Sequence, residues 1–149
     1  METKIKKELI DTGFGFPIRL KNVPMVKDRG TWTPKINYNH LADAVLYSLA
    51  FKSSRLTGFE ITFIRNHFEM TLQEFAGRFC VTHVGVLKWE KAKDKSTVMS
   101  WTTEKDIRLF ILSKLHVKPT LIVQLYSELE TIPEGKSAPL DVDAGDLAA

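Results

Sequence analysis

A cluster of basic side chains lies near the middle of the chain, at His83, Lys88, Lys91, Lys93 and Lys95. The lysine ammonium group is a compact cation with three hydrogen-bond donors, and the histidine ring adds one or two more. Such groups bind phosphate oxygens, and from a helix they can also donate to the edges of bases. Ordinary solvated surfaces are rich in lysine too, so the chemistry of this cluster depends on the element that presents it.

The sequence offers little for catalysis or for metal binding. Its histidines are His40, His67, His83 and His116. Their spacings include neither HxH nor HxxxH, which would place two rings on one metal ion. Cys80 has a histidine three residues later, but a catalytic thiol also needs an orienting group and a pocket. Gly13 and Gly15 lack the spacing and the following Lys-Ser/Thr of a phosphate-binding loop. We therefore expect no enzyme activity, no metal and no cofactor.

The composition fits one compact domain with appendages, since 44% of the 149 residues are hydrophobic. No run approaches the ~18–20 apolar residues of a membrane span, and the N-terminus lacks the apolar core of a signal peptide. A single cysteine excludes an internal disulfide. We expect a cytoplasmic protein that does not associate with membranes.

Charge is distributed unevenly along the chain. The net charge is +3, but the last seventeen residues hold four acids and one base and carry −3, which leaves +6 on the rest. A basic body is compatible with a polyanionic partner. The same C-terminal residues include two prolines and two glycines and have little to bury, so 133–149 is expected to be a disordered acidic tail.

Residues 13–36 are expected to be extended, within an N-terminal hairpin segment of residues 1–36. Phe16, Ile18 and Leu20 alternate with other residues in the manner of a strand. Asp28-Arg29-Gly30 lies between two apolar stretches and fits a hairpin turn. A lone hairpin is marginal in water, so this one must pack on the helices or on a second subunit.

The rest of the chain is expected to be helical. Apolar residues recur at helical spacing from Leu41, with Asn39 as a possible N-cap, and Pro119 suits a first turn. Capping boxes begin at Thr57 and Thr71, and Thr82 offers another N-cap. The expected helices cover 40–51, 58–68, 72–79, 82–91, 102–115 and 119–131, with a polar link over 51–56.

The three central helices each carry one apolar face. These faces are Ile61, Ile64 and Phe68, then Phe75, Ala76 and Phe79, then Val81, Val86 and Trp89. When these faces are packed, the 82–91 helix directs His83, Val84, Leu87, Lys88 and Lys91 outward. Val84 and Leu87 are apolar at positions where exposure is expected. They either face a ligand or pack against the N-terminal segment or a partner protein.

Residues 57–92 resemble the helix-turn-helix of the Cro-repressor class, also called the xenobiotic-response-element class. The matching pieces, in order and with the spacing of the family, are Thr71, Glu74-Phe75-Ala76, Val81-Thr82, Val86 and Lys88-Trp89-Glu90. The resemblance implies a mainly α protein with a five-helix Cro-repressor-like domain, an additional upstream helix and a small N-terminal β-hairpin. The expected boundaries are 1–36 for the hairpin segment, 37–56 for the helix and link, 57–132 for the DNA-binding domain and 133–149 for the tail.

The resemblance also implies roles for individual residues. The contacts it implies to DNA bases are Thr82, His83, Val84 and Lys88, and those to phosphates are Thr71, Gln73, Lys91, Lys93 and Lys95. Thr71 would bind a phosphate with its hydroxyl or its backbone N–H. Lys88 would donate to guanine, and Val84 would pack on a thymine methyl group. Arg65 and Glu90 would form an ion pair that ties the first helix to the end of the third.

Three residues depart from the family pattern. Cys80 stands where the family usually has a glycine with positive φ, at a cost of about 1 kcal/mol or more if the turn is kept. Ala92 replaces a C-terminal glycine, so the third helix could run further. Gly85 lies inside the third helix, which it weakens by up to about 1 kcal/mol, while it could allow close approach to DNA.

The resemblance predicts a bacterial or phage repressor that binds double-stranded DNA as a homodimer. Its site would be an inverted repeat, and that repeat could lie in its own promoter. The dimer contact could come from the 119–131 helix, with Leu121, Ile122, Leu125, Leu129 and Ile132 on one side, or from the N-terminal hairpin with Trp32.

Two other functions remain open at this point. The order of the parts is similar to that of MqsA-type antitoxins, although the CxxC pairs of their zinc domain are missing, so an antitoxin with a toxin protein as partner is one alternative. A protein-binding adaptor that does not read DNA is the other. The chain ends in Leu147-Ala148-Ala149, similar to the end of the bacterial ribosome-rescue degradation tag, which would suit a labile regulator.

Overall fold

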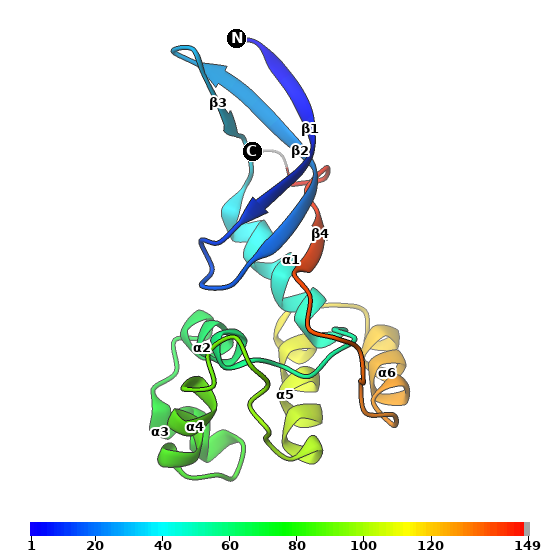
Figure 1. Ribbon diagram of the computed structural model, residues 1–149. Coiled ribbons are helices and arrows are strands. Elements are labelled where there is room, and N and C mark those ends of the chain that lie inside the picture. The colour runs from blue at the N-terminus through cyan, green and yellow to red at the C-terminus, as the bar shows by residue number, and fades with distance from the viewer. Residues whose placement is uncertain (148–149) are drawn as a thin grey trace. The chain divides into compact units, whose positions relative to one another are not determined.

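The computed structural model describes residues 1–147. In chain order, its elements are β1 (Thr3–Asp11), β2 (Ile18–Asp28), β3 (Thr31–Pro34), α1 (Tyr38–Ala50), α2 (Gly58–His67), α3 (Leu72–Arg78), α4 (His83–Glu90), α5 (Trp101–Lys114), α6 (Pro119–Glu128) and β4 (Leu140–Asp143) (Figure 1). They form two compact units. The first unit contains Met1–Ser48 and the chain from Pro139 onward, and the second contains Leu49–Ala138.

The first unit is a mixed sheet built around β2. β1 pairs antiparallel with β2 from Thr3↔Val26 to Asp11↔Ile18. On the other edge of β2, β3 pairs antiparallel with one end and β4 pairs parallel with the other. Arg29 and Gly30 both have positive φ and join β2 to β3, as a two-residue hairpin requires.

The buried face of this sheet changes register at Asn22. Ile18 and Leu20 are buried on one side of it, and Val23 and Met25 on the other, so the alternation shifts by one residue. Asn22 has a φ of 55°, a conformation that asparagine tolerates better than most residues. The unit's buried core also contains Leu41, Val45 and Leu46 of α1 and Leu140 and Val142 of β4.

The fold class expected from the sequence was therefore wrong. The described residues form an α/β fold with six helices and a four-stranded mixed sheet, not a mainly α protein with a small hairpin. β1 escaped prediction because its side chains are exposed along nearly the whole strand, so no apolar alternation marks it. Asn37, rather than Asn39, caps α1, through its side-chain carbonyl.

The C-terminal segment is also ordered where the structure describes it. Leu140 and Val142 are buried in the sheet, and Asp141 lies 3.4 Å from the guanidinium of Arg19. Further upstream, the Gly135 N–H donates to the carbonyl oxygen of Ser53 at 2.9 Å. The expectation of a disordered tail failed because β4 gains its partner from a strand about 120 residues earlier. Ala148 and Ala149 of the expected degradation signal lie outside the described residues.

The second unit contains α2–α6, each within three residues of the bounds expected from the sequence. Phe75, Phe79, Phe110 and Phe68 form a chain of edge-to-face contacts with ring centroids 4.8–5.4 Å apart. On α6, Leu125 and Leu129 are buried within the unit. This side of α6 therefore closes the helical core. Among the described residues, no helix has the length and apolar character needed to cross a membrane.

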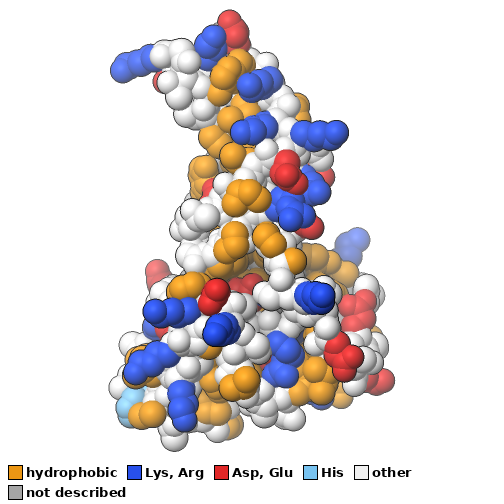
Figure 2. Space-filling model, viewed as in Figure 1, with side chains coloured by type: hydrophobic (Ala, Val, Ile, Leu, Met, Phe, Trp, Pro, Cys, Tyr) orange, Lys and Arg blue, Asp and Glu red, His pale blue; other side chains and the backbone are white. Residues whose placement is uncertain are grey.

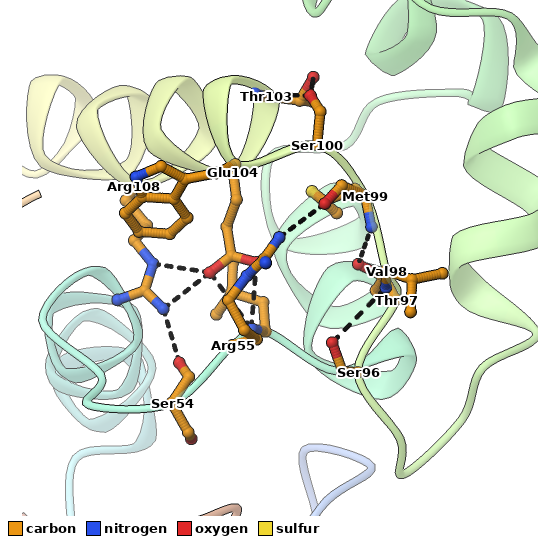
Figure 3. A network of polar contacts seen from close by, with 12 residues as sticks. Ser54, Arg55, Ser96, Thr97, Val98, Met99, Ser100, Thr103, Glu104 and Arg108 are labelled. Carbon is orange, nitrogen blue, oxygen red and sulfur yellow. Dashed lines mark hydrogen bonds and ion pairs between the residues drawn. The ribbon is translucent and has the colours of Figure 1, made fainter. Parts of the chain in front are cut away.

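A buried ionic network fixes the link between α1 and α2 (Figure 3). Arg108 of α5, with 1% of its side chain exposed, donates to both Glu104 Oε2 and the carbonyl oxygens of Ala50, Lys52 and Ser54 at 2.6–3.3 Å. Burial lowers the pKa of Arg108, and the carboxylate of Glu104 opposes that effect. All five N–H groups of the guanidinium have acceptors, which is the condition for burying this cation.

Two further cations complete the network. Arg55 Nε donates to Glu104 Oε1 at 2.8 Å, and Arg55 Nη2 donates to the Met99 carbonyl at 2.6 Å. Lys52 Nζ lies 2.7 Å from Glu60 Oε1, and both side chains are buried. The same Glu60 oxygen accepts from the Thr57 N–H, so the network extends into the first turn of α2.

Arg108→Met is expected to destabilise the protein by about 3–5 kcal/mol, because it leaves the Glu104 carboxylate and three carbonyls without their buried partner. Denaturant unfolding measures the change. The control is Arg78→Met, which breaks an ion pair with Asp106 whose side chains are 42% and 48% exposed, and which should cost less than about 1 kcal/mol. Equal losses in the two variants would contradict a dominant role for the buried network.

Candidate nucleic-acid interface

The cap residues expected from the sequence start the three helices of the interface. Thr57 Oγ1 accepts from the Glu60 N–H at 3.3 Å, and Thr71 Oγ1 accepts from the Glu74 N–H at 3.1 Å. In both capping boxes the glutamate carboxylate also accepts a hydrogen bond from the backbone N–H of the threonine. Thr82 Oγ1 accepts from the Gly85 N–H at 3.1 Å and begins α4. These caps satisfy N–H groups that have no partner within the helix.

The turn between α3 and α4 keeps the left-handed residue that the resemblance implies. Cys80 has a φ of 58°, and the Val81 N–H donates to the Ala76 carbonyl at 3.0 Å. A non-glycine residue in this conformation costs about 1 kcal/mol or more, so the cap of α4 and its buried face must offset that strain. The sequence difference at this position leaves the backbone of the turn intact.

An ion pair fixes the C-terminal end of α4. Arg65 Nε and Nη2 donate to the two carboxylate oxygens of Glu90 at 2.8 and 3.0 Å, so the pair expected from the resemblance is present. The hydrogen bond to Glu90 raises the pKa of Arg65. Thr62 Oγ1 donates to the same carboxylate at 3.0 Å, and Arg65 Nη1 donates to the Met70 carbonyl at 2.9 Å. With Val86 and Trp89 buried, α4 is held along one face and at one end.

The opposite face of α4 is open. The residues that the resemblance assigns to bases, Thr82, His83, Val84 and Lys88, are all exposed. Val84 is 58% exposed and Leu87 39% exposed, so the described residues of their own unit leave both side chains uncovered. The sequence placed Leu87 outward, but it was assigned neither to bases nor to phosphates. Its position one turn after Val84 is the signal that groups the two on one surface.

The phosphate contacts implied for α3 need one correction. Thr71 and Gln73 are exposed, but the Thr71 N–H already donates to Glu74 Oε1 at 3.1 Å. That backbone group is therefore not free for a phosphate while the capping box is closed. The Thr71 hydroxyl accepts a bond in the box and retains its own proton to donate.

The lysines after α4 lie on a loop anchored to the start of α2. The Gly58 N–H donates to the Lys95 carbonyl at 3.2 Å, and the Phe59 N–H donates to the Lys93 carbonyl at 2.8 Å. Lys91, Lys93 and Lys95 themselves are exposed. The loop thus uses its carbonyls to complete the N-terminus of α2 and directs its ammonium groups into solvent.

The third helix of the motif does not extend past Ala92, as the absence of a glycine at this position had suggested it could. The helix ends at Glu90 with Lys91 as its C-cap, so it does not run further. Lys93, with a φ of 57°, supplies the left-handed residue that a glycine usually provides.

The charge of this surface is mostly positive. Lys88, Lys91, Lys93 and Lys95 are its cations, and the Glu90 carboxylate is neutralised by Arg65. Asp94 is the acid that remains exposed between them. On the face seen in Figure 2, basic and hydrophobic side chains lie next to one another over the region of α3 and α4. This mixture suits a ligand with an anionic backbone and partly apolar edges.

The described residues contain no group of three or more histidine, cysteine, aspartate or glutamate side chains that could hold a metal ion. An apolar groove of about 390 Å³ lies in the second unit, lined by Leu109 and Phe110 of α5 and by Ile122, Val123 and Tyr126 of α6, with the Arg78–Asp106 pair at its side. In comparisons with known proteins, no family model, no curated protein and no solved structure matches this chain.

Gly58→Ala is expected to destabilise the protein by about 1–3 kcal/mol, as overpacking does. A Cβ at Gly58 would lie 2.5–2.8 Å from backbone atoms of Trp89, Glu90 and Lys93, and backbone yields less readily than a flexible side chain. Gly77→Ala is the matched control, because a Cβ there meets no described atom within 4 Å and alanine favours the helix by up to about 1 kcal/mol. Opposite signs in thermal unfolding are expected, and a neutral Gly58→Ala would contradict the close packing of α2 on the α4 end.

Proposed function

We propose that this protein is a sequence-specific DNA-binding regulator, a repressor in the simplest case, that reads duplex DNA with α4. One observation carries the proposal: Thr82, His83, Val84 and Lys88 are exposed on one surface of a helix whose other face is buried and whose end is held by the Arg65–Glu90 pair. A helix fixed in this way presents its side chains in a constant register, which base recognition requires.

The dimensions of α4 suit a major groove. An α-helix with its side chains is about 10–12 Å across, close to the groove width of about 12 Å, and α4 has one face that no described residue of its unit covers. The N-terminal residues of such a helix contact base edges, where Lys88 would donate to guanine O6 and N7. Lys91, Lys93 and Lys95, together with Gln73 and the Thr71 hydroxyl on α3, would hold phosphates on either side.

A homodimer on an inverted repeat belongs to the same proposal, because two α4 helices about 34 Å apart would enter successive turns of one groove. Leu125 and Leu129 of α6 are buried within the second unit, which argues against that side of α6 as the dimer contact. The N-terminal unit, with Trp32 half-buried on β3, remains the other source.

A protein-binding adaptor is the second candidate, and the exposed Val84 and Leu87 favour it. An antitoxin would combine DNA binding with a toxin protein as partner. Binding experiments with the whole chain distinguish these functions. A DNA-binding regulator is expected to retain a duplex selected from a random pool, whereas an adaptor would retain a stoichiometric protein partner and no duplex.

Lys88→Ala and Lys93→Ala are expected to weaken DNA binding in different ways. Loss of a base contact at Lys88 should cost about 1–3 kcal/mol on the selected site and relax specificity at one position. Loss of a phosphate contact at Lys93 should lower the affinity for all DNA sequences equally and reduce the dependence of affinity on salt concentration. Gel shifts on specific and random duplexes at several salt concentrations measure both effects. Identical behaviour of the two variants would remove the assignment of Lys88 to bases.

Gly85→Ala is expected to raise stability and lower affinity. Gly85 has no positive φ, and a Cβ there meets no described atom nearer than Thr82 Oγ1 at 3.4 Å, so alanine should stabilise α4 by up to about 1 kcal/mol. Gly85 lies beside Lys88, which follows it at i+3, so a methyl group there should keep the backbone from the groove and weaken binding by about 1–3 kcal/mol. Thermal unfolding and gel shifts are measured together, with Gly77→Ala as the control that stabilises α3. Unchanged affinity in Gly85→Ala would show that α4 does not approach DNA at this residue.

A further inference from the structure

We infer that α4 selects its DNA site by the 5-methyl groups of pyrimidines, whether thymine or methylated cytosine, through an apolar strip in which Leu87 extends the thymine contact that the resemblance implies for Val84. This inference rests on the proposed function and specifies what the helix reads. Val84 is 58% exposed and Leu87 39% exposed. Positions i and i+3 of a helix are neighbours on its surface, so the two side chains form one apolar strip between the cap of α4 and its basic end.

An apolar strip has a defined chemical partner in a major groove. Thymine presents its 5-methyl group there, and the other groups on the base edges are hydrogen-bond donors and acceptors. Valine and leucine carry no donor or acceptor, so they gain nothing from those polar groups. Burying them against a methyl group removes apolar area from water on both sides of the contact.

The charges around the strip favour DNA over an apolar protein surface as its partner. Lys88 and Lys91 lie next along the same helix, and Lys93 and Lys95 follow on the loop, all exposed. Docking an apolar protein face would strip water from these ammonium groups without giving them a partner. The phosphates that flank a major groove supply that partner, so a duplex satisfies the apolar and the charged parts together.

The backbone of α4 allows the short valine side chain to reach a base. Valine extends little beyond its Cβ, so the helix axis must come close to the groove floor. Gly85 leaves the side of the helix next to Lys88, its neighbour at i+3, without a side chain, and neither its φ nor a neighbouring described atom requires a glycine there. Close approach of the backbone to a ligand is a common reason for glycine at such a position.

The same geometry extends the inference to methylated cytosine. A methyl group on C5 of cytosine projects into the major groove from the same ring carbon as that of thymine. An apolar strip without donors or acceptors distinguishes the methyl group and not the base that carries it. A C·G pair at the contacted position should therefore be bound when the cytosine is 5-methylated and rejected when it is not.

The test uses the full chain and a duplex recovered from a random pool, with each thymine replaced singly by uracil. Uracil keeps every hydrogen-bonding group and lacks the methyl group, so it isolates the apolar contact. At the contacted positions we expect binding to weaken about fourfold per methyl group, the effect of exposing one buried carbon. Cytosine at such a position should bind as weakly as uracil or more weakly, and 5-methylcytosine should restore much of the affinity.

Variants connect the effect to the two residues. Val84→Ala and Leu87→Ala should each reduce the thymine-to-uracil ratio toward one at a different position, and both remain folded because the side chains are exposed and alanine favours a helix. Lys93→Ala is the matched control, since it should weaken both duplexes and leave the ratio unchanged.

The outcomes separate this inference from the proposed function. A ratio of one at every thymine, with tight binding of the selected duplex, overturns methyl reading and leaves DNA binding in place. Failure to retain any duplex overturns the proposed function itself. Retention of a protein instead, lost in Val84→Ala, would overturn both and assign the strip to a protein interface.

Discussion

A guanidinium removed from water must find an acceptor for each of its N–H groups, and Arg108 finds them in Glu104 and in a segment of chain without regular structure. Residues 51–56 cannot satisfy their own carbonyls through a helix or a sheet, and Arg108 of α5 donates to the carbonyls of Lys52 and Ser54 in this segment. The link is thereby fixed up to Leu56, whose carbonyl accepts from the Thr97 N–H at 3.2 Å. This link leads directly into α2, whose first residue Gly58 packs against the backbone at the end of α4, so the buried cation supports both helices.

Three of the seven described non-glycine residues with positive φ lie between α3 and α5, on either side of α4. Cys80, Lys93 and Val98 all have left-handed backbone conformations that glycine would adopt without strain, and for Val98 this is unusual because β-branched residues avoid it. Gly85 adds the intrinsic helix cost of glycine. The opposing contributions are specific: the cap at Thr82, the Arg65–Glu90 pair and the buried side of α4.

The features that could be predicted from the sequence are those that depend on residues close together along the chain, namely helix caps and helix bounds. Caps at Thr57, Thr71 and Thr82 and apolar residues at helical spacing fixed the helices of the second unit to within three residues. β1 and β4 were missed because a strand is defined by its partner, and the partner of β4 lies at the other end of the chain. Glu104 and Arg108 were equally hidden, since charges at i and i+4 normally mark a solvated helix face.

The two units differ in how they can attract a polyanion. The first unit carries eight basic and eight acidic residues, and its sheet face pairs Arg19 with both Glu8 and Asp141. Its charges are balanced within the unit, so it contributes little long-range attraction to DNA. The second unit carries +3, and several of its acids are engaged internally with Arg65, Lys52 and Arg108. The exposed Lys88, Lys91, Lys93 and Lys95 lie close together in sequence on and after α4, next to the apolar strip of Val84 and Leu87.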